Sequence, residues 1–212
     1  MVFFEKSQPA PKSLEAKRCY RGEDVLIRLE EDFKNKCYLC EQKEPTSINV
    51  EHFVPHRENE NLKFDWNNLF FSCSHCNNTK SDKYDNLLNC IVETDDVENK
   101  LKYIFIAFPK KQVQIEATEQ SEKSKNTKNL LLDIYNGTTP LKKLESANLR
   151  KHLFNEIEVF QTLLQDFQKT KSENSKNAIL VHINRASSFT AFKRWIIKDS
   201  PKLKMEFEQY FD

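Results

Sequence analysis

The sequence predicts an α+β fold that is mostly helical. Two Cys-x-x-Cys pairs enclose a pattern of strand, loop, strand and helix within residues 37–90. Alternating apolar and polar residues predict a short hairpin over residues 103–117. Apolar residues at helical spacing then dominate the chain from residue 129 to its end. We therefore expect a small cysteine-containing core with helices before and after it.

In the N-terminal part, the pattern predicts one helix and then two short strands. Residues 22–33 are expected to be helical because their apolar side chains recur every three or four positions. The alternation of residues 48–50 predicts a strand, and the apolar run at residues 69–71 predicts a second one. A helix is expected to begin at Ser74 or Cys76. Strand, loop, strand and helix is therefore the expected order.

The C-terminal part is expected to consist of a hairpin followed by helices. Residues 103–108 and 112–117 are the expected strands, and residues 119–128 read as a charged surface segment. Three helices are then expected, at residues 129–135, 146–169 and 188–198. We divide the chain into a first domain, residues 1–90, and a mainly helical region, residues 91–212, as a candidate partner-binding region.

Composition excludes several classes of protein. The chain has 33 Lys and Arg residues against 32 Asp and Glu residues, so its net charge does not indicate nucleic-acid binding. With two glycines in 212 residues, it has no glycine-rich phosphate loop or dinucleotide fingerprint. A signal peptide and a long apolar stretch are both absent, which predicts a cytoplasmic location. In a reducing compartment, cysteines are typically metal ligands or free thiols.

The cysteine spacing predicts a structural zinc site. Each two-residue spacer lets two thiolates reach one tetrahedral ion, and two such pairs close a four-sulfur shell. The predicted ligands are Cys37, Cys40, Cys73 and Cys76. A closed shell leaves no position for water, so this Zn²⁺ would stabilise the fold. The alternatives are four ordinary buried cysteines or a redox pair, and Cys19 and Cys90 are expected to be small core residues.

Three polar residues lie between or beside the cysteine pairs. Glu51 and His52 follow the first predicted strand, and Asn77 comes directly after the last cysteine. A carboxylate, an imidazole and a side-chain amide are the groups that a metal-dependent phosphodiesterase needs. The alternative is that the Glu-His dipeptide has no function and that the asparagines are turn and capping residues.

Together these residues resemble the HNH nuclease motif in its zinc-containing form, over about residues 33–84. The resemblance implies a ββα unit around one divalent metal. It implies that His52 is the general base, that Glu51 and Asn77 hold Mg²⁺ or Mn²⁺, and that Asn68 positions the loop. The chain departs from the family pattern at two positions. The acidic ligand is Glu51 in place of the commoner Asp, and Asn77 replaces the final His, which makes this an H-N-N variant.

Several further charged residues have two interpretations. His56, Lys80 and Lys83 could contact substrate phosphates, or they could be loop and solvated surface residues. His75 is expected to be exposed. The basic and aromatic segment 185–204 could contact nucleic acid, or it could be an amphipathic helix with its aromatic residues in the core. We favour the second interpretation for the aromatic residues.

Outside the motif, the chain is similar to the branch of HNH nucleases found in Septu anti-phage defence systems, some of which accompany retrons. Its markers include Phe3-Phe4-Glu5-Lys6, residues 49–55 and Trp66-Asn67-Asn68-Leu69-Phe70. This similarity implies an ABC-type or SMC-like ATPase as partner. DNA is the favoured substrate, with tRNA as the alternative, and two nicks would suit a homodimer. The competing hypothesis is a zinc-stabilised interaction module without catalytic activity.

Overall fold

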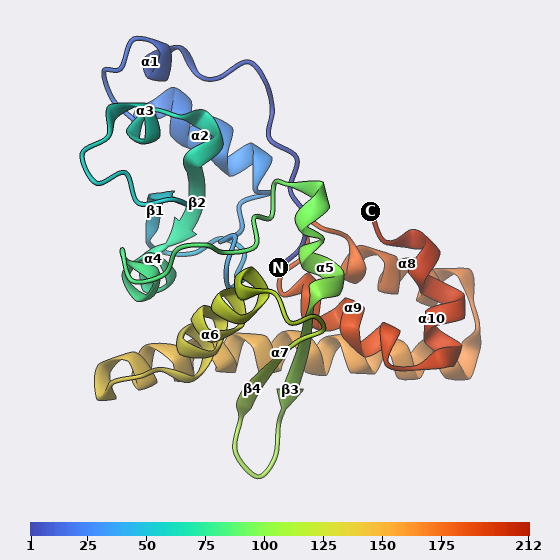
Figure 1. Ribbon diagram of the computed structural model, residues 1–212. Coiled ribbons are helices and arrows are strands. Elements are labelled where there is room, and N and C mark those ends of the chain that lie inside the picture. Colours follow the sequence, from blue (N-terminus) through green and yellow to red (C-terminus); the bar gives the residue numbers. More distant parts are fainter.

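The computed structural model describes all residues, 1–212, and Figure 1 shows how the elements are arranged. In chain order the helices and strands are α1 (Lys12–Glu15), α2 (Glu23–Asp32), β1 (Ile48–His52), α3 (Glu60–Lys63), β2 (Leu69–Cys73), α4 (Ser74–Lys80), α5 (Val97–Lys100), β3 (Leu101–Ile106), β4 (Gln112–Ala117), α6 (Glu122–Asn136), α7 (Pro140–Thr170), α8 (Glu173–Ile183), α9 (Thr190–Lys198) and α10 (Pro201–Phe207). Short 3₁₀ turns are η1 (Trp66–Asn68), η2 (Glu93–Asp95) and η3 (Glu208–Tyr210). The predicted α+β, mostly helical class is confirmed.

The predicted order of strand, loop, strand and helix is also confirmed. Strands β1 and β2 pair antiparallel, with Glu51 opposite Phe70 and His52 opposite Leu69. All five residues of β2 are buried, since α2 packs on this strand, and helix α4 begins directly after it. The unit lies on one side of the molecule, and the β3–β4 hairpin projects from the other (Figure 1).

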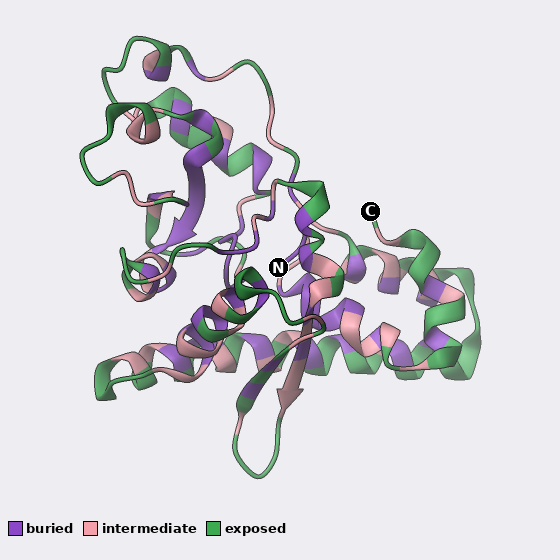
Figure 2. Ribbon diagram, in the orientation of Figure 1, coloured by how far each residue is buried: buried purple, intermediate pink, exposed green.

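Helices of the C-terminal region attach directly to the first cysteine pair. The Tyr135 hydroxyl of α6 donates to the Cys40 carbonyl at 2.7 Å. The Ala191 amide of α9 donates to the buried Glu41 carboxylate at 2.9 Å. One apolar cluster of 37 buried residues extends from the β1–β2 unit and α2 to α6, α7 and α9, and buried segments run through these elements in Figure 2. Side chains from both predicted domains share this cluster.

The boundaries of two predicted helices are wrong. Helix α6 begins at Glu122, because the Ser121 hydroxyl accepts from the Ser124 amide and caps it within the supposed surface segment. Helix α7 begins at Pro140, after the Thr139 cap, and not at residue 146. Helices α8 and α10 were not predicted. Together with α7 and α9 they form the second apolar cluster, which has eight buried residues.

The segment 185–204 is mainly a core element. Phe189 and Phe192 are buried, which confirms the interpretation favoured for the aromatic residues. Lys193 and Arg194 are buried too, and they form ion pairs with Glu156 and with two other carboxylates, respectively. These two cations are therefore engaged within the fold. None of the helices is both long and apolar enough to cross a lipid bilayer.

Candidate metal centre and active site

The four predicted zinc ligands converge on one point. Two of them come from the loop before β1, and two come from the end of β2 and the first turn of α4: Cys37, Cys40, Cys73 and Cys76. Their sulfur atoms all lie within 4.8 Å of one another, all four side chains are buried, and no disulfide joins them. A buried set of four thiols at this separation suits a tetrahedral Zn²⁺ ion. Of the two remaining cysteines, Cys90 is buried as predicted, whereas Cys19 is exposed, so that prediction is wrong.

An open cleft of about 490 Å³ lies beside this metal centre, next to β1 and α4. Polar residues form most of its lining: Tyr20, Arg21, Val50, Glu51, His52, Pro55, His56, Arg57, Asn77, Asn78, Ser81 and Asp82. Four of the residues selected from the sequence therefore meet here, namely Glu51, His52, His56 and Asn77. Asn68, Lys80 and Lys83 are not part of the lining.

His52 is held at the edge of the cleft by its surroundings. Its Nε2 atom lies 3.1 Å from the Lys63 carbonyl oxygen. Because a carbonyl oxygen only accepts, Nε2 carries the proton in this contact and Nδ1 is left as an acceptor. The rings of Tyr20 and His56 pack edge-on against the imidazole, at centroid distances of 4.7 and 4.6 Å. Burial is the main cause that lowers the pKa of His52 below its usual value, and the bond to Lys63 opposes that shift.

Asn68 fixes the loop between the two strands. Its Nδ2 atom donates to the carbonyl oxygens of Val54 and Leu62, both at 2.9 Å. Its Oδ1 atom accepts from the Val54 amide at 2.7 Å. Leu62 directly precedes Lys63, whose carbonyl contacts His52. The buried Asn68 amide is thus connected to His52 through a short stretch of the loop backbone.

Glu51 is paired with the buried Lys80, which differs from both interpretations of Lys80 from the sequence, a phosphate contact and a solvated surface residue. The Lys80 Nζ atom lies 2.7 Å from Glu51 Oε1 and 3.0 Å from the His52 carbonyl oxygen. Lys80 is fully buried because it follows Cys76 by one helical turn, so both side chains point from α4 toward β1. Burial raises the pKa of Glu51, and the Lys80 ammonium opposes that shift. The Glu51 Oε2 atom has no hydrogen-bond partner in the protein, and Glu51 lines the cleft.

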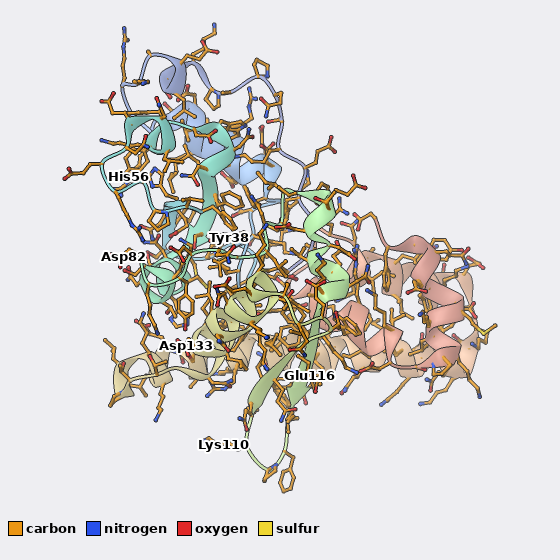
Figure 3. All side chains as sticks on the ribbon, viewed as in Figure 1. Tyr38, His56, Asp82, Lys110, Glu116 and Asp133 are labelled. Atoms are coloured by element: carbon orange, nitrogen blue, oxygen red, sulfur yellow. The ribbon has the colours of Figure 1, made fainter.

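Two of the remaining candidates lie near the cleft. His56 lines it, and its Nδ1 atom accepts from the Glu58 amide at 3.2 Å. Lys83 is exposed outside the lining, with its Nζ atom 3.3 Å from Asp133 Oδ2 on α6. In Figure 3, the labelled His56 and Asp82 lie on the same side of the molecule as the β1–β2–α4 unit.

Sequence reasoning missed several residues of the cleft and misplaced one residue near the metal centre. Tyr20 and Arg21 come from a segment without a motif, so only the tertiary fold reveals them, whereas Arg57 directly follows His56 in the loop of the motif. His75 was expected to be exposed. It is half-buried, and its two ring nitrogens lie 2.8 Å from oxygen atoms of Glu145 on α7 and of Ile134 on α6.

The strand pair, the following helix and the four-cysteine centre have the arrangement expected of an HNH endonuclease domain. Residues 37–83 match the HNH endonuclease family. The chain is also 36% identical over 76 residues to the Septu protein PtuB of Bacillus thuringiensis. That similarity covers 33% of this chain and 30% of the relative, so less than a third of the relative's length is matched. The resemblance to HNH nucleases and to their Septu branch is confirmed over this part of the chain.

Proposed function

We propose that the protein is a metal-dependent endonuclease that hydrolyses phosphodiester bonds in nucleic acid. One observation carries this proposal. Glu51, His52 and Asn77 line a single open cleft beside the four-cysteine centre, within the residues that match the HNH endonuclease family. A non-catalytic zinc unit has no need of an imidazole with a free acceptor nitrogen at such a cleft.

The residues of the cleft fit a divalent metal with oxygen ligands. Glu51 offers the Oε2 atom that Lys80 does not engage, and Asn77 offers a side-chain amide oxygen. Two protein oxygens with water and a phosphate oxygen form a site typical of Mg²⁺, for which Mn²⁺ can substitute. When bound, such an ion supplies positive charge that stabilises the scissile phosphate and the leaving oxygen.

His52 is the proposed general base. Its Nδ1 atom would take a proton from the attacking water, while Nε2 stays bonded to the Lys63 carbonyl and fixes the ring. The water oxygen forms the new bond to phosphorus, and the phosphorus–oxygen bond to the leaving group breaks. Asn68 acts as a positioning residue through the loop that carries this carbonyl.

The substrate and the partner are further proposals, and the similarity to the Septu relative supports only the second. We favour DNA over tRNA, and we propose that the chain is the effector nuclease of an anti-phage defence complex with an ABC-type or SMC-like ATPase. Incubation of the purified protein with plasmid DNA and with tRNA, each with and without Mg²⁺, distinguishes the two substrates. Cleavage of tRNA alone would contradict the DNA assignment, and the ATPase should co-purify with the chain if the complex exists.

The non-catalytic alternative makes a different prediction in cells. The ion pair between Glu51 and Lys80 is the observation that favours it, because a purely structural site would also use such a pair. It predicts that His52→Ala leaves defence against phage intact, whereas Cys73→Ser abolishes it. The nuclease proposal predicts that Glu51→Ala, His52→Ala and Cys73→Ser all abolish defence.

A further inference from the structure

A second polar cavity, of about 360 Å³, lies between the β3–β4 hairpin and the junction of α6 with α7. Four cations and two amides line it, without an apolar or acidic residue: Lys110, Lys111, Gln112, Asn136, Lys143 and Arg150. We call this cavity the basic pocket. It is separate from the cleft that contains His52, since the two share no lining residue.

The four cations of the basic pocket have no carboxylate partner, although ion pairs are common elsewhere in the chain. Arg150 donates through Nη1 to the Tyr135 carbonyl, while its Nε atom is buried without a hydrogen-bond partner. The Lys111 ammonium lies 3.5 Å from the ring centroid of Phe154. A concentration of unpaired positive charge around a cavity is an anion-binding environment.

The fold holds the pocket in place at two points. Asn136 exchanges hydrogen bonds of 2.8 and 3.2 Å with the backbone of Val113, which fixes the end of α6 to β4. Gly137 has a φ of +74°, and a Cβ atom there would lie 2.6 Å from the Lys143 amide nitrogen. This close approach brings the first turns of α7 to the end of α6. Lys143 and Arg150 are seven residues apart, so they share one face of α7.

The pocket and the cleft are connected through the surface of α6. Asp82 lines the cleft, and the adjacent Lys83 pairs with Asp133 on α6. Asp133 and Asn136 are three residues apart, so they are neighbours on the helix surface. In Figure 3, the labelled Asp82, Asp133 and Lys110 follow one another down the same side of the molecule. The cleft and the basic pocket therefore lie along the same side of the molecule, with the Lys83–Asp133 ion pair between them.

We propose that the basic pocket binds a backbone phosphate of the nucleic acid whose cleavage site lies in the cleft. This inference rests on the proposed nuclease function for the identity of its ligand. A guanidinium with lysine ammonium groups suits a phosphate, and such contacts position a nucleic acid without reading its sequence. The phosphate of a free nucleotide has the same chemistry. Its base, however, would find no aromatic or apolar side chain in this lining to stack on.

The test is nucleic-acid binding measured by fluorescence anisotropy, without added Mg²⁺ or Mn²⁺, for labelled duplex DNA and for tRNA. The variant is Lys110→Ala with Lys143→Ala, both at exposed positions, so the fold should be retained. The matched control is Lys169→Ala with Lys202→Ala, two exposed lysines on α7 and α10 that form no ion pair. Circular dichroism checks that all variants are folded.

We expect the magnitude of the slope of log binding constant against log salt concentration to fall by about 1 for the Lys110 and Lys143 variant, because the pocket neutralises one phosphate. The control should keep the slope of the unaltered protein. Equal slopes for both variants would overturn the proposal. The proposal would also be overturned if the Lys110 and Lys143 variant lost ATP binding while its salt slope for nucleic-acid binding did not change. That result would assign the pocket to free nucleotides. If the slope falls as expected but no substrate is cleaved with Mg²⁺, the pocket assignment stands and the nuclease proposal fails.

Discussion

Lys80→Met removes the cation from the buried ion pair and should strongly destabilise the fold. Lys80 is fully buried, and it bonds to the Glu51 carboxylate and to the His52 carbonyl. Methionine keeps the chain length but leaves Glu51, which is 5% exposed, without its counter-charge. Loss of one partner from a buried pair costs about 3–5 kcal/mol. Since Glu51 borders the open cleft, we expect the low end, about 3 kcal/mol, which lowers the melting temperature of a chain of this size by about 6–12 °C.

The assay is thermal and urea unfolding, followed by circular dichroism with equimolar zinc and no other divalent metal. Lys83→Met is the matched control, because its exposed pair with Asp133 should contribute no more than about 1 kcal/mol. Glu51→Gln combined with Lys80→Met removes both charges, and it should cost less than Lys80→Met alone. If Lys80→Met loses no more stability than Lys83→Met, the inferred energetics of the buried pair are wrong.

Two further predictions concern the metal centre and the loop. Cys73→Ser removes one of the four zinc ligands, so the amount of bound zinc, measured by mass spectrometry, and the melting temperature should both fall. Cys19→Ser, at an exposed position, should change neither, and full zinc retention by Cys73→Ser would contradict the four-cysteine site. Asn68→Ala leaves three loop backbone groups without their hydrogen-bond partner, which should lower the free energy of unfolding by about 2 kcal/mol and slow nucleic-acid cleavage by about 10²-fold. The control is Asn67→Ala, at an exposed position, and equal cleavage rates for the two variants would refute the positioning role.

Local spacing in the sequence was enough to predict the metal centre and the strands beside it. Cysteine pairs two residues apart constrain their own geometry, and the alternation at residues 48–50 places Glu51 and His52 at the end of a strand. The burial of Lys80 was not predicted, although its spacing holds a signal. Lys80 follows the predicted zinc ligand Cys76 by four residues, so the two share one face of α4, but a lysine side chain is normally expected at the surface.

Contacts between distant segments of the chain were the second feature that the sequence could not predict. Tyr20 and Arg21 reach the cleft from a part of the chain without periodicity. The basic pocket brings together residues 110–112, 136, 143 and 150, which become neighbours through the tight α6–α7 connection at Gly137. Helix α8 was missed because most of its apolar residues form one continuous run, residues 178–181, without helical spacing. Helix α10 was missed because it has only seven residues.

The most direct test of the proposed active site compares the cleavage rates of His52→Ala and His56→Ala with that of the unaltered protein. Both imidazoles lie in the same cleft, but only His52 has the fixed Nε2 contact that leaves Nδ1 to accept a proton. With Mg²⁺ and the cleaved substrate, we expect His52→Ala to slow the reaction by at least about 10²-fold at unchanged zinc content, and His56→Ala by less than about tenfold. Undiminished cleavage by His52→Ala would contradict the assignment of the general base.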